Sequence, residues 1–200
     1  MRGLFRGSLG TASDSPASPG AATIREATTP SGVALARALF VEYAQWLDVD
    51  LCFQGFDAEL ESLPGAYAPP FGRLLLAGHP GAAFGCVALR PLEQGCGCGT
   101  PGAGKADPRV GEVKRLYVQP AHRGERWGYR LASAVIADAI AIGYRELKLD
   151  TLGRMREARA LYAKLGFREC AAYYHNPLPE VVYMSLDLSA GGGRSGSGSW

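Results

Sequence analysis

Three arginines mark a short basic turn where a strand-like run leads into an amphipathic stretch. Arg123, Arg126 and Arg130 follow the run that ends at Pro120 and surround the start of a helical apolar pattern. The first backbone N–H groups of a helix have no partner inside it, and the helix dipole adds partial positive charge at that end. With guanidinium groups around it, this helix start predicts an anion site that suits a pyrophosphate.

The elements that must hold this turn in place alternate between helix and strand. Apolar residues recur at helical or strand spacing, with Ser31 as the expected cap of the first helix and Gly166 as the stop of the last. Since the later strand–helix–strand unit requires parallel pairing with a right-handed crossover, we expect an α/β fold of the α+β type with helices on both faces of a mixed sheet. The expected helices are residues 31–47, 56–63, 127–142 and 155–165, and the expected strands are residues 73–77, 83–89, 112–118, 147–151 and 181–188.

Segments rich in glycine and serine bound and interrupt this ordered part. Residues 1–21 and 190–200 hold too few large apolar side chains to offset their ordering entropy, so the first is expected to be a disordered tail and the second a flexible one. Residues 94–108 are mostly glycine and other small residues, which predicts a long, flexible surface loop. One domain, residues 22–189, remains between the tails.

The overall composition argues against several classes of partner. Lysine and arginine total 21 and aspartate and glutamate total 19, so broad electrostatic binding of nucleic acid or of a membrane surface is not expected. No apolar run is long enough to span a bilayer, and the N-terminal residues lack the apolar core of a secretory signal. The five cysteines are irregularly spaced, which favours reduced thiols and a cytoplasmic protein over a disulfide framework.

Two motif-like patterns in the glycine-rich segment are interpreted as carrying no chemistry. The run from Gly99 to Ala106 approaches a nucleotide-binding loop, but Ala106 replaces the hydroxyl residue that would hold Mg²⁺, and Asp107-Pro108 begins no helix. Cys96 and Cys98 lack a second cysteine or histidine pair nearby, so we expect no metal site.

The basic turn and the last helix together resemble the GNAT acetyltransferase superfamily. That family's acetyl-CoA signature, Arg/Gln-x-x-Gly-x-Gly/Ala after a strand, falls into register with Arg123 and Gly128, and Arg126 stands where its first glycine is usual. A second match runs from Leu161 to Phe167 and looks like the family's Leu-Tyr-x-x-x-Gly-Phe helix end. The asparagine that often begins this helix is replaced by Met155. The resemblance extends over residues 22–188.

This resemblance implies a mostly antiparallel central sheet with one parallel, splayed strand pair. It also implies direct transfer of an acetyl group from acetyl-CoA to an amine, with no acyl-enzyme and no metal. Main-chain groups of the strand would pair with the pantetheine arm, and amides of the turn would hold the pyrophosphate. The implied cofactor-binding residues are Leu116, Tyr117, Val118, Arg123, Gly124, Arg126, Trp127, Gly128 and Tyr129.

The resemblance also implies which residues would move protons. Tyr162 would lie beside the thioester sulfur and protonate the departing thiolate, since a tyrosine keeps its proton at neutral pH. A glutamate at the position of Glu112 is the general base in some family members; the plain structural alternative is an edge carboxylate paired with Lys114 or Arg115. The residues expected to shape the acceptor pocket, before the last strand, are Tyr173, Tyr174 and His175.

Alternatives to an enzyme stay open at this stage. One is a non-catalytic acyl-CoA-binding or regulatory module, which is suggested by Arg126 in place of the usual glycine and Met155 in place of the usual asparagine. Separately, the structural alternative for Tyr162 is a core aromatic with its hydroxyl at the rim. In a protein-interaction domain, the long glycine-rich loop would be the functional part. The acceptor, a small molecule or a protein amine, is not readable from the sequence, and because dimers are common in the family a homodimer also stays open.

Overall fold

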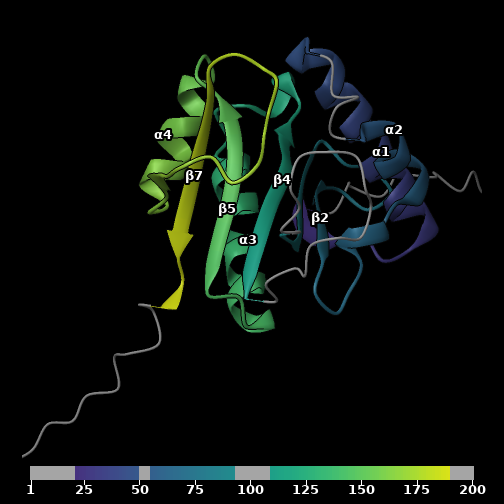
Figure 1. The fold of residues 1–200 in the computed structure, drawn as a ribbon. Helices are drawn as coiled ribbons and strands as arrows, with labels where there is room; N and C mark the ends of the chain where they lie inside the picture. Colours follow the sequence, from purple (N-terminus) through teal and green to yellow (C-terminus); the bar gives the residue numbers. More distant parts are fainter. Residues whose placement is uncertain (1–20, 50–54, 93–108, 190–200) are drawn as a thin grey trace, which may run out of the picture.

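In the described part of the chain seven strands form one sheet, and helices cover both of its faces (Figure 1). The computed structural model describes residues 21–49, 55–92 and 109–189. In order across the sheet the strands are β1 (Thr23–Glu26), β2 (Arg73–Gly78), β3 (Gly85–Pro91), β4 (Val110–Val118), β5 (Glu146–Leu152), β7 (Val181–Asp187) and β6 (Arg168–Glu169). Neighbouring strands pair antiparallel except β4 and β5, which pair parallel. The expected mixed, mostly antiparallel sheet is therefore confirmed.

The sheet separates the apolar core into two clusters, one on each of its faces. The helices are α1 (Pro30–Leu47), α2 (Phe56–Ser62), α3 (Trp127–Ile142) and α4 (Arg156–Lys164), with 3₁₀ turns at Gly65–Tyr67 and Pro120–His122. Phe40 of α1 belongs to the cluster on one face, whereas Leu131 of α3 and Tyr162 of α4 belong to the cluster on the other. Because both faces are covered, β2 and β3 are buried along most of their length, as their continuous apolar runs predict.

Helix α1 begins one residue earlier than the sequence analysis predicts. Pro30 is its first residue, and the hydroxyl oxygen of Thr29 accepts a hydrogen bond from the N–H of Gly32 at 3.1 Å. The prediction of Ser31 as the cap is wrong. Proline suits the first helical position, since its fixed φ is already helical and its missing N–H is not needed there, and this places the cap at Thr29.

Two edge strands, β1 and β6, were not predicted. Strand β1 has four residues, of which Ile24 is the large apolar one, and β6 has two exposed residues. Both form by pairing with a longer neighbour, β2 and β7 respectively. Segments this short carry no readable alternation. The other strands and helices agree with the predictions to within a few residues, and α3 agrees at both ends.

Several sequence predictions lie outside the described residues. They concern residues 1–20 of the predicted N-terminal tail, the loop 94–108 with its motif-like patterns, and the tail 190–200. Within the part of the chain that the structure describes, no helix is both long and apolar enough to cross a membrane.

Strands β4 and β5 separate soon after they begin to pair. Pairing joins Val110–Glu112 to Glu146–Lys148, and beyond it no described strand pairs with the β5-facing edge of Val113–Val118. On the other edge of β4 the register with β3 shifts, and Arg115 lies at this irregularity with a left-handed φ of 57°. The splayed parallel pair that the sequence analysis expects is confirmed, and it leaves main-chain groups of β4 available to a ligand.

Candidate active site

A groove of three adjoining cavities runs from the N-terminal end of α3 to the gap between β4 and β5. The outer cavity, about 590 Å³, lies at the start of α3; the middle cavity, about 450 Å³, lies against β4; and the inner cavity, about 60 Å³, lies in the gap. The outer and middle cavities share Val118, Arg123, Gly128, Glu157 and Leu161. The middle and inner cavities share Leu47, Leu116, Met155 and Ala158. These shared walls make a continuous path.

The outer cavity is cationic and is bounded by the first turn of α3. Arg123, Arg126 and Lys164 line it together with one carboxylate, Glu157, and the first turn of α3 contains no acidic residue. The N-terminal N–H groups of α3 and these cations therefore favour an anion in the same place. Lys164 was not predicted, although it lies inside the second family-like motif. Arg130 stacks on Trp127, with its guanidinium 3.7 Å from the ring centroid.

Arg126 adopts a conformation that usually requires glycine. It is the cap residue of α3, with φ 64° and ψ 14°, which is left-handed backbone. For a residue with a Cβ this conformation costs about 1–2 kcal/mol, whereas glycine adopts it without strain. The turn thus keeps the shape that the glycine of the signature would give, and the arginine adds a cation to the cavity wall.

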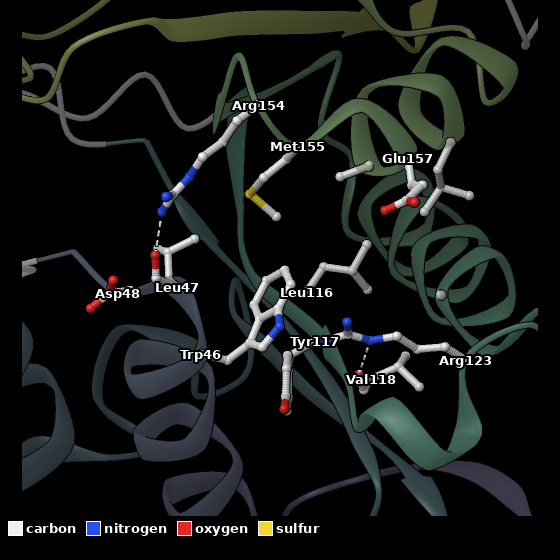
Figure 2. Close-up of a pocket in the computed structure, with 13 residues that line it drawn as sticks. Trp46, Leu47, Asp48, Leu116, Tyr117, Val118, Arg123, Arg154, Met155 and Glu157 are labelled. Atoms are coloured by element: carbon white, nitrogen blue, oxygen red, sulfur yellow. Dashed lines mark hydrogen bonds between the residues drawn. The ribbon is translucent and has the colours of Figure 1, made fainter.

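The middle cavity passes between the end of α1 and the free edge of β4 (Figure 2). Leu116, Tyr117 and Val118, the residues that the sequence analysis assigned to the pantetheine arm, line its β4 side. The opposite side includes Trp46, whose side chain is exposed, and Leu47. This narrow passage between a helix end and a strand edge suits an extended chain that carries its own amide groups.

Two arginines connect the walls of the middle cavity. The guanidinium of Arg123 lies 4.4 Å from the Trp46 ring centroid, and its Nε donates a hydrogen bond to the carbonyl of Val118 at 3.0 Å (Figure 2). Arg154, just before α4, donates a hydrogen bond to the carbonyl of Leu47 at the end of α1. The end of α1 is therefore attached both to the basic turn and to the segment that begins α4.

Tyr162 and Asp150 line the inner cavity, where the two strands part. The side chain of Tyr162 is buried, and its ring packs edge-on against Phe167 with centroids 5.6 Å apart. Burial, with smaller contributions from Tyr43 and Asp150, raises the pKa of the Tyr162 hydroxyl. Tyr162 can therefore donate a proton or a hydrogen bond near neutral pH, but it does not act as a phenolate.

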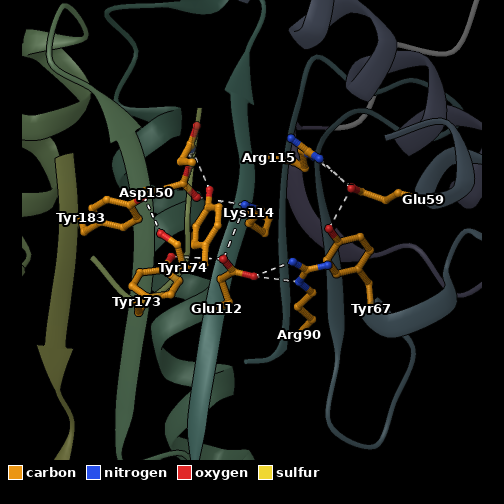
Figure 3. A network of polar contacts seen from close by, with 11 residues as sticks. Glu59, Tyr67, Arg90, Glu112, Lys114, Arg115, Asp150, Tyr173, Tyr174 and Tyr183 are labelled. Atoms are coloured by element: carbon orange, nitrogen blue, oxygen red, sulfur yellow. Dashed lines mark hydrogen bonds and ion pairs between the residues drawn. The ribbon is translucent and has the colours of Figure 1, made fainter. Parts of the chain in front are cut away.

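Glu112 is the last residue of β4 that pairs with β5, and its side chain is buried among cations (Figure 3). Its carboxylate lies 2.7 Å from Nη2 of Arg90 and 3.5 Å from Nζ of Lys114, and it accepts a hydrogen bond from the hydroxyl of Tyr173 at 3.1 Å. Burial alone would raise the pKa of Glu112, but Lys114 and Arg90 outweigh burial and lower it. Glu112 is therefore ionised and fully engaged, and it does not line the inner cavity.

Arg115, the other expected partner of Glu112, points towards α2. It makes two hydrogen bonds to Glu59, at 2.6 and 2.9 Å, and the Tyr67 hydroxyl donates to the same carboxylate at 2.8 Å. Of the two partners that the structural alternative offered for Glu112, Lys114 is present, and Arg115 pairs with Glu59 instead. Regular alternation along β4 would point Arg115 to the face opposite Lys114. Its left-handed φ breaks that alternation, so the side chain turns towards α2 instead.

The segment before β7 brings two of the three expected acceptor-site residues to this network. Tyr173 reaches Glu112, and Tyr174 lies under the ammonium of Lys114, which is 5.8 Å from the ring centroid. The hydroxyl of Tyr183 donates to the carbonyl of Tyr174 at 3.0 Å and so attaches the segment to β7. His175 is exposed.

Three charged members of the network were not predicted from the sequence: Glu59, Arg90 and Asp150. They come from α2, β3 and β5, so no local spacing connects them. Asp150 occupies an ordinary polar position in the alternation of β5, and that alternation is the only signal it leaves in the sequence. Among the described residues, no group of three histidine, cysteine, aspartate or glutamate side chains is arranged to hold a metal ion.

Comparisons with known proteins agree on one family. Residues 38–167 match the model of the acetyltransferase (GNAT) family. An uncharacterized N-acetyltransferase of Schizosaccharomyces pombe is 41% identical over 152 residues, which cover 76% of this chain and 85% of the relative. The structure of a GNAT-family acetyltransferase from Staphylococcus aureus matches with a TM-score of 0.65 at 19% identity, over 84% of this chain and 99% of that one. A GNAT-family acetyltransferase from Brucella melitensis, solved in complex with acetyl-CoA, matches with a TM-score of 0.56 at 21% identity, over 84% of this chain and 88% of that one.

Proposed function

The chain belongs to the GNAT acetyltransferase family, and we propose that it transfers the acetyl group of acetyl-CoA directly to a primary amine of a small molecule or a protein. The observation that carries the proposal is the continuous groove, which has cations and a helix N-terminus at one end and a buried tyrosine at the other. A diphosphate suits the first end, a pantetheine arm suits the free edge of β4, and a thioester suits the gap.

In the proposed complex the main chain does most of the binding. Groups of Leu116–Val118 pair with the amides of the pantetheine arm, as an added strand would. The diphosphate binds the N–H groups at the start of α3, and Arg123, Arg126 and Lys164 neutralise its charge. The small residues Gly124 and Gly128 let the phosphates approach the backbone. Trp127 is buried at the start of α3, and the half-buried Tyr129 lines the outer cavity.

Chemistry in the gap then needs positioning and two proton transfers. The amine nitrogen attacks the thioester carbonyl, and the C–S bond breaks as the tetrahedral intermediate collapses. Tyr162 protonates the leaving thiolate, since its raised pKa keeps the phenol protonated. The second transfer takes a proton from the amine; Glu112, the base that the resemblance implies, is engaged by Arg90 and Lys114, so a proton could reach it only through Tyr173 or an intervening water.

A cytoplasmic location is part of the proposal. Within the described residues Cys86 and Cys170 are free thiols, which suits a reducing compartment. Cell fractionation with an antibody to the chain tests this location, and recovery with secreted proteins would contradict it.

Calorimetry and mass spectrometry test the proposed activity. We expect acetyl-CoA to bind more tightly than ATP or NAD, because of the three it alone joins a diphosphate to an extended arm that carries amide groups. Incubation of the chain and acetyl-CoA with a panel of amines should then add one acetyl group to at least one of them. Binding without transfer to any amine would instead support a non-catalytic acyl-CoA-binding module, and absence of acetyl-CoA binding would exclude both functions.

A further inference from the structure

Asp150 is the carboxylate that faces the reacting end of the groove. It lies on β5 two residues past Lys148, the last residue that pairs with β4, and it lines the inner cavity together with Tyr162. Its side chain is 12% exposed, so it is sheltered from water but can be reached through the cavity. Glu112 lies at the level where the strands still pair, two residues before Lys114 on β4 (Figure 3).

Tyrosine side chains from four parts of the chain surround Asp150. Burial is the largest cause of the raised pKa of each of these tyrosines, and the negative charge of Asp150 is a further cause. They are Tyr43, Tyr162, Tyr173, Tyr174 and Tyr183. The rings of the last three pack against one another with centroids 5.2 to 5.6 Å apart. A carboxylate among aromatic rings provides the charge and the π faces that bind an organic ammonium.

An ammonium group already occupies this environment in the structure. Nζ of Lys114 lies 2.9 Å from Oδ1 of Asp150 and 5.8 Å from the ring centroid of Tyr174. On the other carboxylate oxygen, Oδ2, the amide of Asn176 donates at 3.5 Å. The hydroxyl of Tyr174 also makes a hydrogen bond to Asp150. An ionised carboxylate offers about four lone-pair sites, so beside these three donors Asp150 has capacity for one more that arrives through the cavity.

The size of the inner cavity limits the shape of that donor. Its volume is about 60 Å³, and the acetyl group of the cofactor has to share it. In so small a space, an amine at the end of an unbranched chain is easier to accommodate than an amine on a fully substituted carbon. The geometry therefore favours the end of an alkyl chain.

We propose that Asp150 binds the ammonium group of the acceptor and takes a proton from it, which makes the acceptor class an unbranched primary alkylamine. The inference rests on the proposed acetyltransferase function and assigns the acceptor end of the same site. It moves the role of base, which the resemblance implies for Glu112, to Asp150, and leaves Glu112 to hold Lys114 and Tyr173 in place.

The proposed reaction balances in protons and electrons. The Asp150 carboxylate takes one proton from the ammonium, and the freed nitrogen lone pair forms the C–N bond to the thioester carbonyl. Collapse of the oxyanion breaks the C–S bond, and the sulfur keeps the electron pair and receives the Tyr162 proton. The proton that the nitrogen still loses restores Tyr162, and the proton on Asp150 passes to solvent. Ammonium and acetyl-CoA thus give an acetamide, the CoA thiol and one proton.

A pH series with Asp150→Asn tests the proposal. The probes are n-butylamine, 1,5-diaminopentane and L-lysine, and kcat/KM is measured for the best of them from about pH 7 to pH 9, well below the alkylammonium pKa near 10.4. The wild-type value should change little over this range, since Asp150 recruits the charged form. For the variant we expect a loss of about 100-fold or more at pH 7 that shrinks about tenfold per pH unit, as the free amine grows. Acetyl-CoA affinity should stay within about twofold.

Other titratable groups near Asp150 do not produce this signature. The surrounding tyrosine pKa values are all raised, so their hydroxyls stay protonated over the range used. Charged and titratable groups face Asp150 from several parts of the chain besides β5 itself. Strand β4 contributes Lys114, Arg115 and, farther away, Glu112. The tyrosines are Tyr43 of α1, Tyr162 of α4, Tyr173 and Tyr174 of the segment before β7, and Tyr183 of β7. The matched control is Asp187→Asn, at the exposed far end of β7, which should keep wild-type kcat/KM at every pH.

Several outcomes would overturn the inference. A loss in Asp150→Asn that is the same at every pH would show a structural role, and no loss would show no role. If Asp150→Asn fails to fold, the double variant Asp150→Asn/Lys114→Met, which removes both charges of the pair, takes its place. The wild-type profile decides independently of any variant: a tenfold rise per pH unit would mean that the free amine binds unaided, against the proposal. If the wild-type chain acetylates no amine at all, the proposed function fails and the inference falls with it.

Discussion

The two ends of the groove are built in different ways. The cofactor end consists of a run of neighbouring residues, from Leu116 on β4 to Tyr129 on α3, and it relies on backbone groups and partly exposed cations. The acceptor end is a buried network whose charges come from α2, β3, β4 and β5. In the proposed function the first end binds acetyl-CoA, whereas the second recognises the amine acceptor.

This difference shows which kind of interaction each task uses. A diphosphate can be held by N–H groups that any residue except proline supplies, so only the backbone conformation matters, and even an arginine is tolerated where glycine is usual. An ammonium needs particular side chains in particular places, and each buried charge needs a partner. We therefore expect substitutions at the acceptor end to affect chemistry and folding, and substitutions at the cofactor end to affect acetyl-CoA affinity.

Tyr162→Phe should have the largest effect, on the rate of transfer. Loss of the hydroxyl removes the proton donor for the thiolate, so kcat should fall by about 10²- to 10⁴-fold, while acetyl-CoA affinity measured by calorimetry stays within about twofold. Tyr144→Phe is the control, because this buried hydroxyl donates to the carbonyl of Phe71, away from the groove. A Tyr162→Phe variant with nearly full kcat would reduce the tyrosine to a packing residue.

Glu112→Gln should destabilise the fold, since Arg90 and Lys114 would lose a buried charged partner. We expect a loss of about 3 kcal/mol in the free energy of unfolding near neutral pH, measured by urea denaturation. The pKa of Glu112 is lower in the folded chain, so its contribution is present above its unfolded pKa of about 4.3 and disappears as the pH falls further. The difference between wild type and variant should therefore shrink below about pH 4. The control is Glu169→Gln, which removes an exposed ion pair with Arg159 and should lower the free energy of unfolding by no more than about 0.5 kcal/mol. An equal loss in both variants would contradict a stabilising role for the buried Glu112.

Gly128→Val should weaken acetyl-CoA binding by about 30-fold, or roughly 2 kcal/mol, without unfolding the chain. A Cβ at this position would meet Leu161 at 3.6 Å, an ordinary contact, so the fold has room for a larger residue. The groove does not, since Gly128 lines both the outer and the middle cavity. Gly128→Ala should give a smaller loss. Unchanged affinity in a valine variant with a wild-type circular dichroism spectrum would place the diphosphate elsewhere.

Arg126→Gly should have the smallest effect, and in two opposite directions. Glycine removes the strain of the left-handed conformation but adds freedom to the unfolded chain, so stability should rise by about 0.5–1 kcal/mol. Acetyl-CoA affinity should fall about threefold, because one cation of the cavity wall is lost. Arg126→Ala, which loses the cation but keeps the strain, should show the loss of affinity without the gain in stability. A glycine variant that is less stable than wild type would refute the strain.

The same contrast explains what could be predicted from the sequence. Strand β4, the basic turn and the helix α3 are contiguous, and the residue types that form them are dictated by local backbone geometry, so their positions could be read directly. The ion pair between Lys114 and Asp150 joins residues of two strands that meet only after the crossover through α3. The direction of Arg115 depends on an irregularity in β4 that no sequence pattern signals, and the cap of α1 was misplaced because proline and serine both suit a helix start.

The short parallel pairing divides the sheet into two halves that are joined at one end, by Val110–Glu112 and Glu146–Lys148. Past these pairs, within the part of the chain that is described, the Lys114–Asp150 ion pair connects the halves and no main-chain ladder does. Amide protons on the open edge of β4 should therefore exchange rapidly with deuterium in the ligand-free chain. If acetyl-CoA pairs with this edge as an added strand, it should slow the exchange of these amides. The two halves of the sheet, which open separately in the ligand-free chain, should then open together.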